Sequence, residues 1–415
     1  MNMRILIYMN PLIVDKISKK FLWEKDSGFL YTKQLIESLP IDWRFTILTP
    51  KGFDREFFDD KHEIECIEYD YSTSIHQNRY HFNRNILAKT LPYGVDIDVV
   101  LNMQPEVTAN LKVFFENQRR EKPIIINYFH WIDCKESRNS GERFIYRQAE
   151  GYNDADLNLF HNEYAKLLFI NSCTDDLIQL KPKKIGYFHP LPTTYGTEDI
   201  PLPDKFILFN HRLNNTTGWK QIVKIFKKLN YPDVKLWLTD ESNLKEKEFL
   251  EHDNIIVKSI PYESYGYLLR NAHFSICNLQ EYATWNMAVL DSINHGTPVL
   301  SNESKLMEYL GCISNNDMEK AISEGLIYPK KDVIPTIIQD YPLKEYIINE
   351  LKLRVKDKYP KKYEDVLELL PCEKRVFVNT LWSFHANSNF QIIRWKLLTT
   401  GIVDDITKKL TSYIK

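Results

Sequence analysis

The sequence predicts an α/β protein made of two doubly wound parallel-sheet domains that face a cleft, followed by a helical C-terminal tail. Short, uniformly apolar segments alternate with amphipathic segments over residues 3–160, and the same alternation starts again at residue 206. Strands that are apolar throughout are typical of parallel sheets covered by helices on both faces. The length of 415 residues also suits more than one domain.

The first domain is expected to span residues 1–195. Its strands are predicted at residues 3–9, 44–48, 99–101, 124–128 and 157–160, with a helix at 29–39 after a long loop. The runs between these strands have helical periodicity, which places a helix between successive strands of one sheet. A strand–helix alternation of this kind predicts a parallel, doubly wound sheet.

A proline-rich, polar stretch at residues 190–203 is the best candidate for an interdomain linker. The second domain is expected at residues 203–342, and the tail at residues 343–415 is expected to dock across both domains. Strands of the second domain are predicted at residues 206–209, 234–238, 255–257 and 274–277, with a further buried strand starting at residue 297.

Composition excludes several classes of protein. The net charge of −2 argues against a surface coated with basic residues, although it leaves room for a local basic groove. Six cysteines are scattered without a CxxC pair, so we expect reduced thiols and a cytoplasmic location. No run approaches the about 18 apolar residues of a membrane span. We therefore expect no membrane association, and we expect a monomer.

The segment FILFNHRLNNTTGWKQIVKIF, residues 206–226, combines an apolar strand, a polar loop and an amphipathic helix. Open α/β sheets bind ligands beyond their strand ends, where this segment holds Arg212 and Lys220. Two cations at that edge suit a diphosphate, and Arg212 can grip two oxygens at once. The alternative is a basic loop that pairs with surface carboxylates.

A second motif, EYATWNMAVLDSINHGTPVLSN, covers residues 281–302. The turn of Thr284, Trp285 and Asn286 would aim the amides of the following helix at an anion. Asp291 lies in the middle of that helix, among apolar residues. A carboxylate against a cleft can accept two hydroxyl hydrogen bonds, as a ribose offers, whereas the alternative is a solvated or capped carboxylate.

These features together resemble the GT-B glycosyltransferases. In that family a glutamate helix is followed by a glycine and Pro-Val, and LDSINHGTPVL matches the spacing with Asp291 in the ribose-binding position. The family's other glutamate, near the donor sugar, corresponds to Ala283, with Glu281 two residues before it. The resemblance implies two Rossmann-like domains, a nucleotide sugar as co-substrate, no other cofactor and no obligatory metal.

Shorter motifs are similar to the phage DNA α-glucosyltransferases, which modify 5-hydroxymethylcytosine. The loop TTGWK, ending at Lys220, with Phe226 six residues later, looks like the corresponding loop of those enzymes. The turn from Tyr128 to His130 resembles their Tyr-x-His turn, which faces the cleft. This resemblance implies double-stranded DNA with hydroxymethylated bases as a partner, and the host cytoplasm as location if the chain is phage-encoded.

Transfer from a nucleotide sugar needs cations for the leaving diphosphate and a group that orients or deprotonates the acceptor. Arg212 and Lys220 are candidates for the first role, and His130 and Asp133 for the second. The alternative for His130 is a structural histidine at a strand end, and for Asp133 it is a helix N-cap. We expect no metal site.

Two segments that mix basic and aromatic residues suit an acceptor with phosphates and an extruded base. The acceptor candidates are Lys16, Lys20, Arg79, Tyr80 and Arg84. The alternative for both segments is a polar surface loop. The sequence thus predicts a glycosyltransferase that uses a uridine-linked glucose or arabinose and acts on a hydroxymethylated pyrimidine in phage DNA. The alternatives are a cytosolic enzyme of glycan biosynthesis and a non-catalytic nucleotide- or DNA-binding module.

Overall fold

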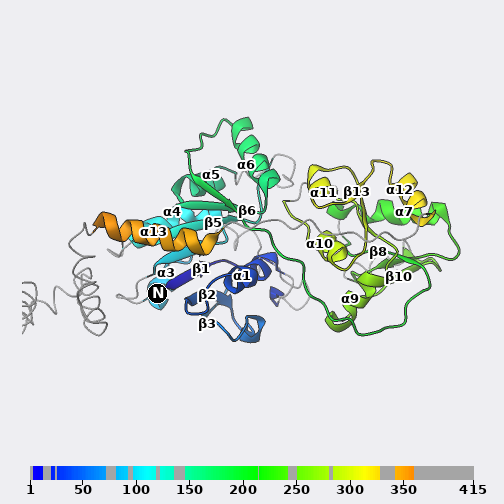
Figure 1. The fold of residues 1–415 in the computed structure, drawn as a ribbon, viewed down its shortest axis with the longest axis horizontal. Helices are drawn as coiled ribbons and strands as arrows, with labels where there is room; N and C mark the ends of the chain where they lie inside the picture. Colours follow the sequence, from blue (N-terminus) through cyan, green and yellow to red (C-terminus); the bar gives the residue numbers. More distant parts are fainter. Residues whose placement is uncertain are drawn as a thin grey trace, which may run out of the picture.

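A computed structural model of the chain describes residues 3–12, 20–23, 26–71, 81–91, 97–117, 122–134, 145–213, 215–241, 250–279, 284–327 and 342–358. Two α/β units lie side by side along the longest axis of the molecule (Figure 1). A single stretch of chain after β7 leads from the first unit into the second.

The N-terminal unit alternates strands and helices as the sequence predicts. Its elements are β1 (Arg4–Tyr8), α1 (Ser27–Glu37), β2 (Arg44–Pro50), β3 (Glu63–Tyr69), α3 (Arg84–Thr90), β4 (Val99–Asn102), α4 (Thr108–Asn117), β5 (Ile124–Phe129), α5 (Ile145–Asp154), β6 (Leu157–Phe160), α6 (Glu163–Asp175) and β7 (Lys184–Tyr187), with 3₁₀ turns at Arg55–Phe57 and Pro105–Val107.

The C-terminal unit repeats the pattern with shorter strands. Its elements are β8 (Phe206–Phe209), a 3₁₀ turn (Asn215–Thr217), α7 (Trp219–Leu229), β9 (Lys235–Leu238), β10 (Ile255–Val257), α9 (Tyr262–Asn271), β11 (Ser275–Cys277), α10 (Met287–Asn294), β12 (Val299–Ser301), α11 (Lys305–Tyr309), β13 (Ile313–Ser314) and α12 (Met318–Ile327); α13 (Leu343–Lys358) follows.

Both sheets are parallel throughout the described residues. The first has the strand order β3-β2-β1-β4-β5-β6-β7, and the second has the order β10-β9-β8-β11-β12-β13. The direction in which strands are added reverses between β1 and β4 and between β8 and β11. In open parallel sheets ligands bind beyond the carboxyl ends of the strands at such reversals. The predicted fold class is therefore confirmed.

Three strands of the structure have no counterpart among those named from the sequence. β3, with the sequence EIECIEY, alternates apolar and acidic residues because it is an edge strand with one face toward water. β7 is also at an edge, and β13 has two residues. A search for uniformly apolar runs detects central strands and overlooks edge strands of this kind.

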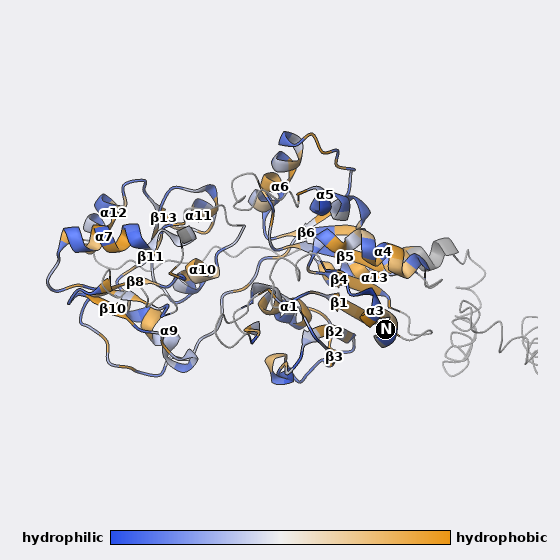
Figure 2. Ribbon diagram, turned by 180° about the vertical axis from the view of Figure 1, so that it is seen from behind, coloured by the Kyte–Doolittle hydropathy of each residue, from blue (hydrophilic) through white to orange (hydrophobic). Residues whose placement is uncertain are grey.

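The largest apolar cluster extends from the core of the first unit to the side of α10 and α11 that faces it. It contains Ile5 and Ile126 of the first sheet together with Trp285, Val289 and Met307 of the second unit. Apolar residues gather in the strands and on the inner faces of the helices (Figure 2). Burial of apolar surface therefore holds the two units together as well as stabilising each of them.

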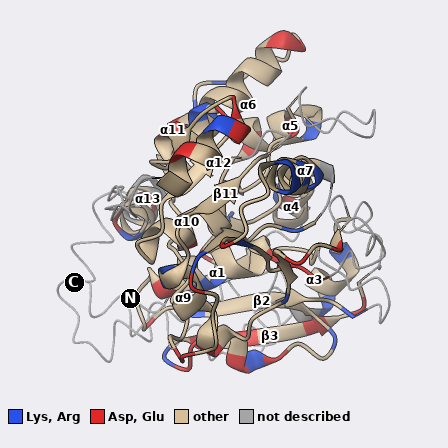
Figure 3. Ribbon diagram, turned by 90° about the vertical axis from the view of Figure 1, so that its right-hand side faces the viewer, with Lys and Arg blue, Asp and Glu red and all other residues tan. Residues whose placement is uncertain are grey.

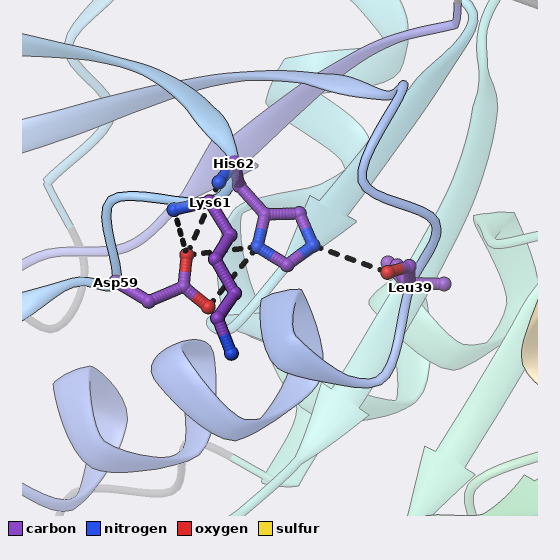
Figure 4. A network of polar contacts seen from close by, with 4 residues as sticks. All are labelled: Leu39, Asp59, Lys61 and His62. Carbon is purple, nitrogen blue, oxygen red and sulfur yellow. Dashed lines mark hydrogen bonds and ion pairs between the residues drawn. The ribbon is translucent and has the colours of Figure 1, made fainter.

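Helix α1 is held in place by hydrogen bonds at its start and just beyond its end. At its start the carboxylate of Asp26 accepts a hydrogen bond from the Gly28 amide at 2.9 Å. Beyond its end, His62 bridges Asp59, 2.9 Å from Nδ1, and the main-chain oxygen of Leu39, 3.1 Å from Nε2 (Figure 4). The buried His62 ring thus ties the chain after α1 to the turn before β3.

The linker is attached to both units. Gln34 of α1 accepts a hydrogen bond from the Leu191 amide at 2.8 Å and donates one to the Leu191 oxygen at 2.9 Å. Further along, Gly196 packs so closely on α9 that a Cβ there would lie 2.3 Å from the main-chain oxygen of Glu263. Only glycine fits this contact, which fixes the linker against the second unit.

The described part of the predicted tail is α13, which returns to the first unit (Figure 1). Its Leu343, Tyr346 and Ile347 belong to the same apolar cluster as the first sheet, and Lys184 of β7 forms an ion pair with Glu350. Residues 359–415 lie outside the described residues. Among the described helices, none is both long and apolar enough to cross a membrane.

We expect Gly151→Ala to lower the free energy of unfolding by about 3 kcal/mol, because the added Cβ would lie 1.9 Å from the main-chain oxygen of Pro105. Denaturant unfolding measures this loss. Gly325→Ala is the control, since its Cβ would first meet the side-chain ends of Phe274 and Leu300, at 3.0 and 3.1 Å. Equal stabilities of the two variants would contradict the close packing of α5 on the turn before α4.

Candidate functional site

The cationic loop after β8 lies at the strand reversal of the second sheet. The Leu213 amide donates to the Asp240 carboxylate at 2.7 Å, and the Thr217 hydroxyl donates to the Arg212 oxygen at 2.7 Å. These bonds hold the loop backbone while the side chain of Arg212 remains exposed. The loop therefore presents a guanidinium at the carboxyl edge of the sheet, where the sequence predicted a diphosphate site.

Lys220 lies in the first turn of α7 rather than in the preceding loop, where the sequence analysis placed it. Its ammonium lies 5.6 Å from the ring centre of Trp219, and the side chain is exposed. Lysines and arginines gather around α7 in the view of Figure 3. Cations at the start of a helix, beside its amide groups, make a local positive field that favours an anion.

A residue from the neighbouring strand braces the start of α7. Asn278, which follows β11, is buried and donates to the Gly218 oxygen at 3.3 Å and to the Gln221 side chain at 3.1 Å. Gly218 has φ 62°, so the backbone there takes the left-handed conformation that glycine adopts without strain. The sequence analysis did not name Asn278, because its partners are distant in the sequence.

The turn before α10 meets the first unit directly. The Thr284 hydroxyl donates a hydrogen bond of 3.1 Å to the main-chain oxygen of His130, which follows β5. The Trp285 ring lies close to two histidines that precede the second unit, with its centre 5.6 Å from that of His161 and 5.9 Å from that of His189. Three residues predicted for donor or catalytic roles, His130, Thr284 and Trp285, therefore come together at this seam.

His161, which the sequence analysis did not single out, lies at the centre of the seam. It is fully buried, 2.6 Å from the Tyr128 hydroxyl through Nδ1 and 3.2 Å from the His130 oxygen through Nε2. Burial, followed by the proximity of His130, lowers the pKa of His161 to about 3. The imidazole is therefore neutral at physiological pH.

Two of the named residues act as helix caps. The buried Asp133 carboxylate accepts a hydrogen bond of 3.1 Å from the amide of Ile145, the first residue of α5. The sequence analysis gave a helix N-cap as the alternative role of Asp133. The structure shows such a contact, although the helix concerned is α5, which begins at Ile145. Asn286 caps α10 by accepting from the Val289 amide at 3.1 Å.

Asp291 is buried on α10 and faces the linker. One carboxylate oxygen accepts from the Thr193 amide at 2.7 Å, and the other accepts from the Tyr195 hydroxyl at 3.0 Å. Burial raises the pKa of Asp291 to about 7, against the opposing effect of these hydrogen bonds. Each oxygen has a further lone pair beyond its bond to the linker, and the contact with a ribose stays a prediction.

The remaining predicted residues are only partly covered by the structure. Lys20 and Arg84 are exposed, and Arg84 is the first residue of α3. Lys16, Arg79, Tyr80 and Glu281 lie outside the described residues. Within the described ranges, no group of three or more His, Cys, Asp and Glu side chains is placed to hold a metal ion.

Comparisons with solved structures agree with this architecture. Similar structures include sucrose-phosphate synthase from Thermosynechococcus elongatus (TM-score 0.58, 14% identity, covering 79% of this chain and 90% of that one). Another is Anabaena HepE in complex with UDP (0.56, 9%, 79% and 90%). A third is described as trehalose-6-phosphate from Escherichia coli bound with UDP-2-fluoro glucose (0.54, 10%, 86% and 96%).

The likeness extends over most of each chain, and it shows that this protein has the GT-B fold. No family model matches the sequence, and no curated protein sequence matches it either.

The raised pKa of Asp291 predicts a pH-dependent stability. The usual pKa of an aspartate is 3.8, and that of Asp291 in the folded protein is about 7. Between these two pH values the folded protein holds a proton that the unfolded chain has released. The contribution of Asp291 to stability therefore falls as pH rises through that range. The side chain of Asp291→Asn does not titrate, so we expect this variant to gain stability relative to the wild type between pH 4 and pH 7.

Urea unfolding at several pH values measures this difference. Asp199→Asn is the control, since Asp199 is an exposed aspartate of the linker. A difference between Asp291→Asn and wild type that stays constant over the range would contradict the prediction.

Proposed function

We propose that this protein is a glycosyltransferase that moves a sugar from a nucleotide diphosphate sugar to an acceptor hydroxyl at the seam between its two domains. The observation that carries the proposal is the cationic edge formed by Arg212 and Lys220 beyond β8. The GT-B fold supports it, as do the similar structures that hold UDP or UDP-2-fluoro glucose. We further propose a uridine-linked donor, with glucose or arabinose as the sugar.

In this reaction the bond between the anomeric carbon and the diphosphate oxygen breaks, and a bond from the acceptor oxygen to that carbon forms. The leaving diphosphate gains negative charge, which Arg212 and Lys220 stabilise. The acceptor hydroxyl passes its proton to the released diphosphate, and in this proposal His130, half-buried at the seam, orients that hydroxyl. The protein supplies this chemistry with side chains, without an obligatory metal ion.

As acceptor we propose the hydroxymethyl group of a modified pyrimidine in phage DNA, which would place the enzyme in the cytoplasm of the infected host. The support is the likeness of TTGWK and of the Tyr-x-His turn to the phage DNA α-glucosyltransferases. The exposed cations Lys20 and Arg84 belong to the first domain, which holds the acceptor in GT-B enzymes. A glycan acceptor is the alternative. Mass spectrometry of hydroxymethylated DNA after incubation with a panel of nucleotide sugars distinguishes the two.

We expect Arg212→Ala and Lys220→Ala each to lower kcat on the order of 10²-fold, because each removes a fixed cation from the leaving group. Release of the nucleoside diphosphate from the nucleotide sugar measures turnover. Lys224→Ala is the matched control, since it removes an exposed lysine from the same helix. Near-normal turnover in both variants would place the diphosphate elsewhere.

A DNA acceptor predicts binding that weakens steeply as salt rises, because phosphate contacts release counterions. Lys20→Glu combined with Arg84→Glu should weaken binding further and lower the salt slope by about one for each lost contact. Gel-shift titrations with hydroxymethylated and plain duplexes test this, with Lys320→Glu on α12 as control. Failure of the wild-type protein to bind DNA at low salt would refute the DNA acceptor and leave the transferase proposal intact.

A further inference from the structure

We propose that Tyr128 and His161 form a positioning relay that holds the main-chain oxygen of His130 in place for Thr284, and thereby fixes the seam between the domains. Neither residue contacts a substrate in this proposal. The relay deepens the proposed function and rests on it for its catalytic consequence, whereas its structural content stands on the geometry of the seam.

The His130 oxygen receives hydrogen bonds from both domains. His161 Nε2 lies 3.2 Å away within the same domain, and the Thr284 hydroxyl lies 3.1 Å away across the seam. A carbonyl oxygen has two lone pairs, so it can accept both hydrogen bonds at once. Its orientation therefore decides whether Thr284, and the start of α10 with it, can bond to the first domain.

The hydrogen bonds determine which nitrogen of His161 carries the proton. A carbonyl oxygen only accepts, so Nε2 must carry the hydrogen. In a neutral ring Nδ1 is then an acceptor, and the Tyr128 hydroxyl, 2.6 Å from Nδ1 and 3.4 Å from the Phe188 oxygen, donates to the nearer atom. Burial keeps the ring neutral, in line with its lowered pKa. Tyr128 thus selects the tautomer that can hold His130.

The rings around His161 fix its position. Tyr31 of α1 and Tyr128 of β5 each lie 5.2 Å from it in nearly perpendicular arrangements, and Trp285 of the second domain lies 5.6 Å away. Edge-to-face contacts of this kind are favourable and directional. Burial raises the pKa of Tyr31, so this neighbour is neutral at physiological pH, and burial and the nearby histidines lower the pKa of His161 rather than raise it. A charged His161 would therefore find no counter-ion among these neighbours.

Transfer requires the donor on the second domain and the acceptor on the first to meet in one geometry. Because the relay fixes the peptide group of His130, it also fixes where the His130 side chain begins. The nucleotide diphosphate, by contrast, binds to the second domain alone in the proposed function. Loss of the relay should therefore lower kcat and leave the affinity for the nucleotide unchanged.

The first test examines the tautomer without any activity. Nitrogen NMR of protein labelled with ¹⁵N-histidine distinguishes neutral Nε2–H, neutral Nδ1–H and charged rings, and the His161→Gln spectrum identifies the His161 signals. We expect His161 to remain neutral with the proton on Nε2 from pH 5 to pH 8. A ring that is charged in this range, or that carries its proton on Nδ1, overturns the relay.

The second test uses three variants. His161→Phe keeps a ring but removes both hydrogen bonds, and we expect kcat to fall about tenfold or more. His161→Gln places an amide nitrogen near the Nε2 position and should recover most of the activity. Tyr128→Phe should cause an intermediate loss. Calorimetry with UDP should give an affinity within about twofold of wild type for all three.

Tyr152→Phe is the control, since it removes another buried tyrosine hydroxyl from the same domain. Equal kcat values for His161→Phe and His161→Gln, in variants that keep the wild-type melting temperature, would overturn the relay. If the wild-type protein transfers no sugar to any acceptor, the proposed function fails, and the imidazole signals still decide the relay.

Discussion

The arrangement of the two domains depends on the linker, which one side chain from each domain holds in place. Gln34 of α1 forms two hydrogen bonds with the backbone of Leu191, and Asp291 of α10 accepts one from the amide of Thr193. Only Pro192 lies between these points, and its ring limits backbone rotation. Any change in the angle between the domains must therefore distort this short segment or break one of its two attachments.

Helix α10 connects this linker to the seam. Asp291 holds the linker from the helix, while Thr284 and Trp285, directly before the helix, contact His130 and His161. The apolar cluster that includes Val289 and Met307 packs the same region against the first sheet. Because packed helices move as rigid units, a displacement of the linker would carry the Thr284 turn with it. The linker, α10 and the turn at Thr284 are therefore expected to move together.

The sequence was sufficient for the fold class and for the central strands, because their apolar runs, as in FILF of β8, carry a strong signal. It also selected His130, Thr284 and Trp285, which the fold brings into contact. It could not supply the partners of Asp291, since Thr193 and Tyr195 lie almost a hundred positions away. Nor did it reveal His161 as the centre of the seam, because a buried histidine has no periodic pattern of its own.

The two cations of the candidate site lie on the same domain. The exposed cations Arg212 and Lys220 belong to the second domain, where the proposed function requires compensation of the leaving diphosphate. On the side of the first domain, burial keeps His161 uncharged, and the Asp133 carboxylate accepts a hydrogen bond from the first amide of α5. In the proposed function, an uncharged imidazole at this place does not attract the departing anion. The His130 oxygen, which accepts from His161 and from Thr284, lies where the two domains meet.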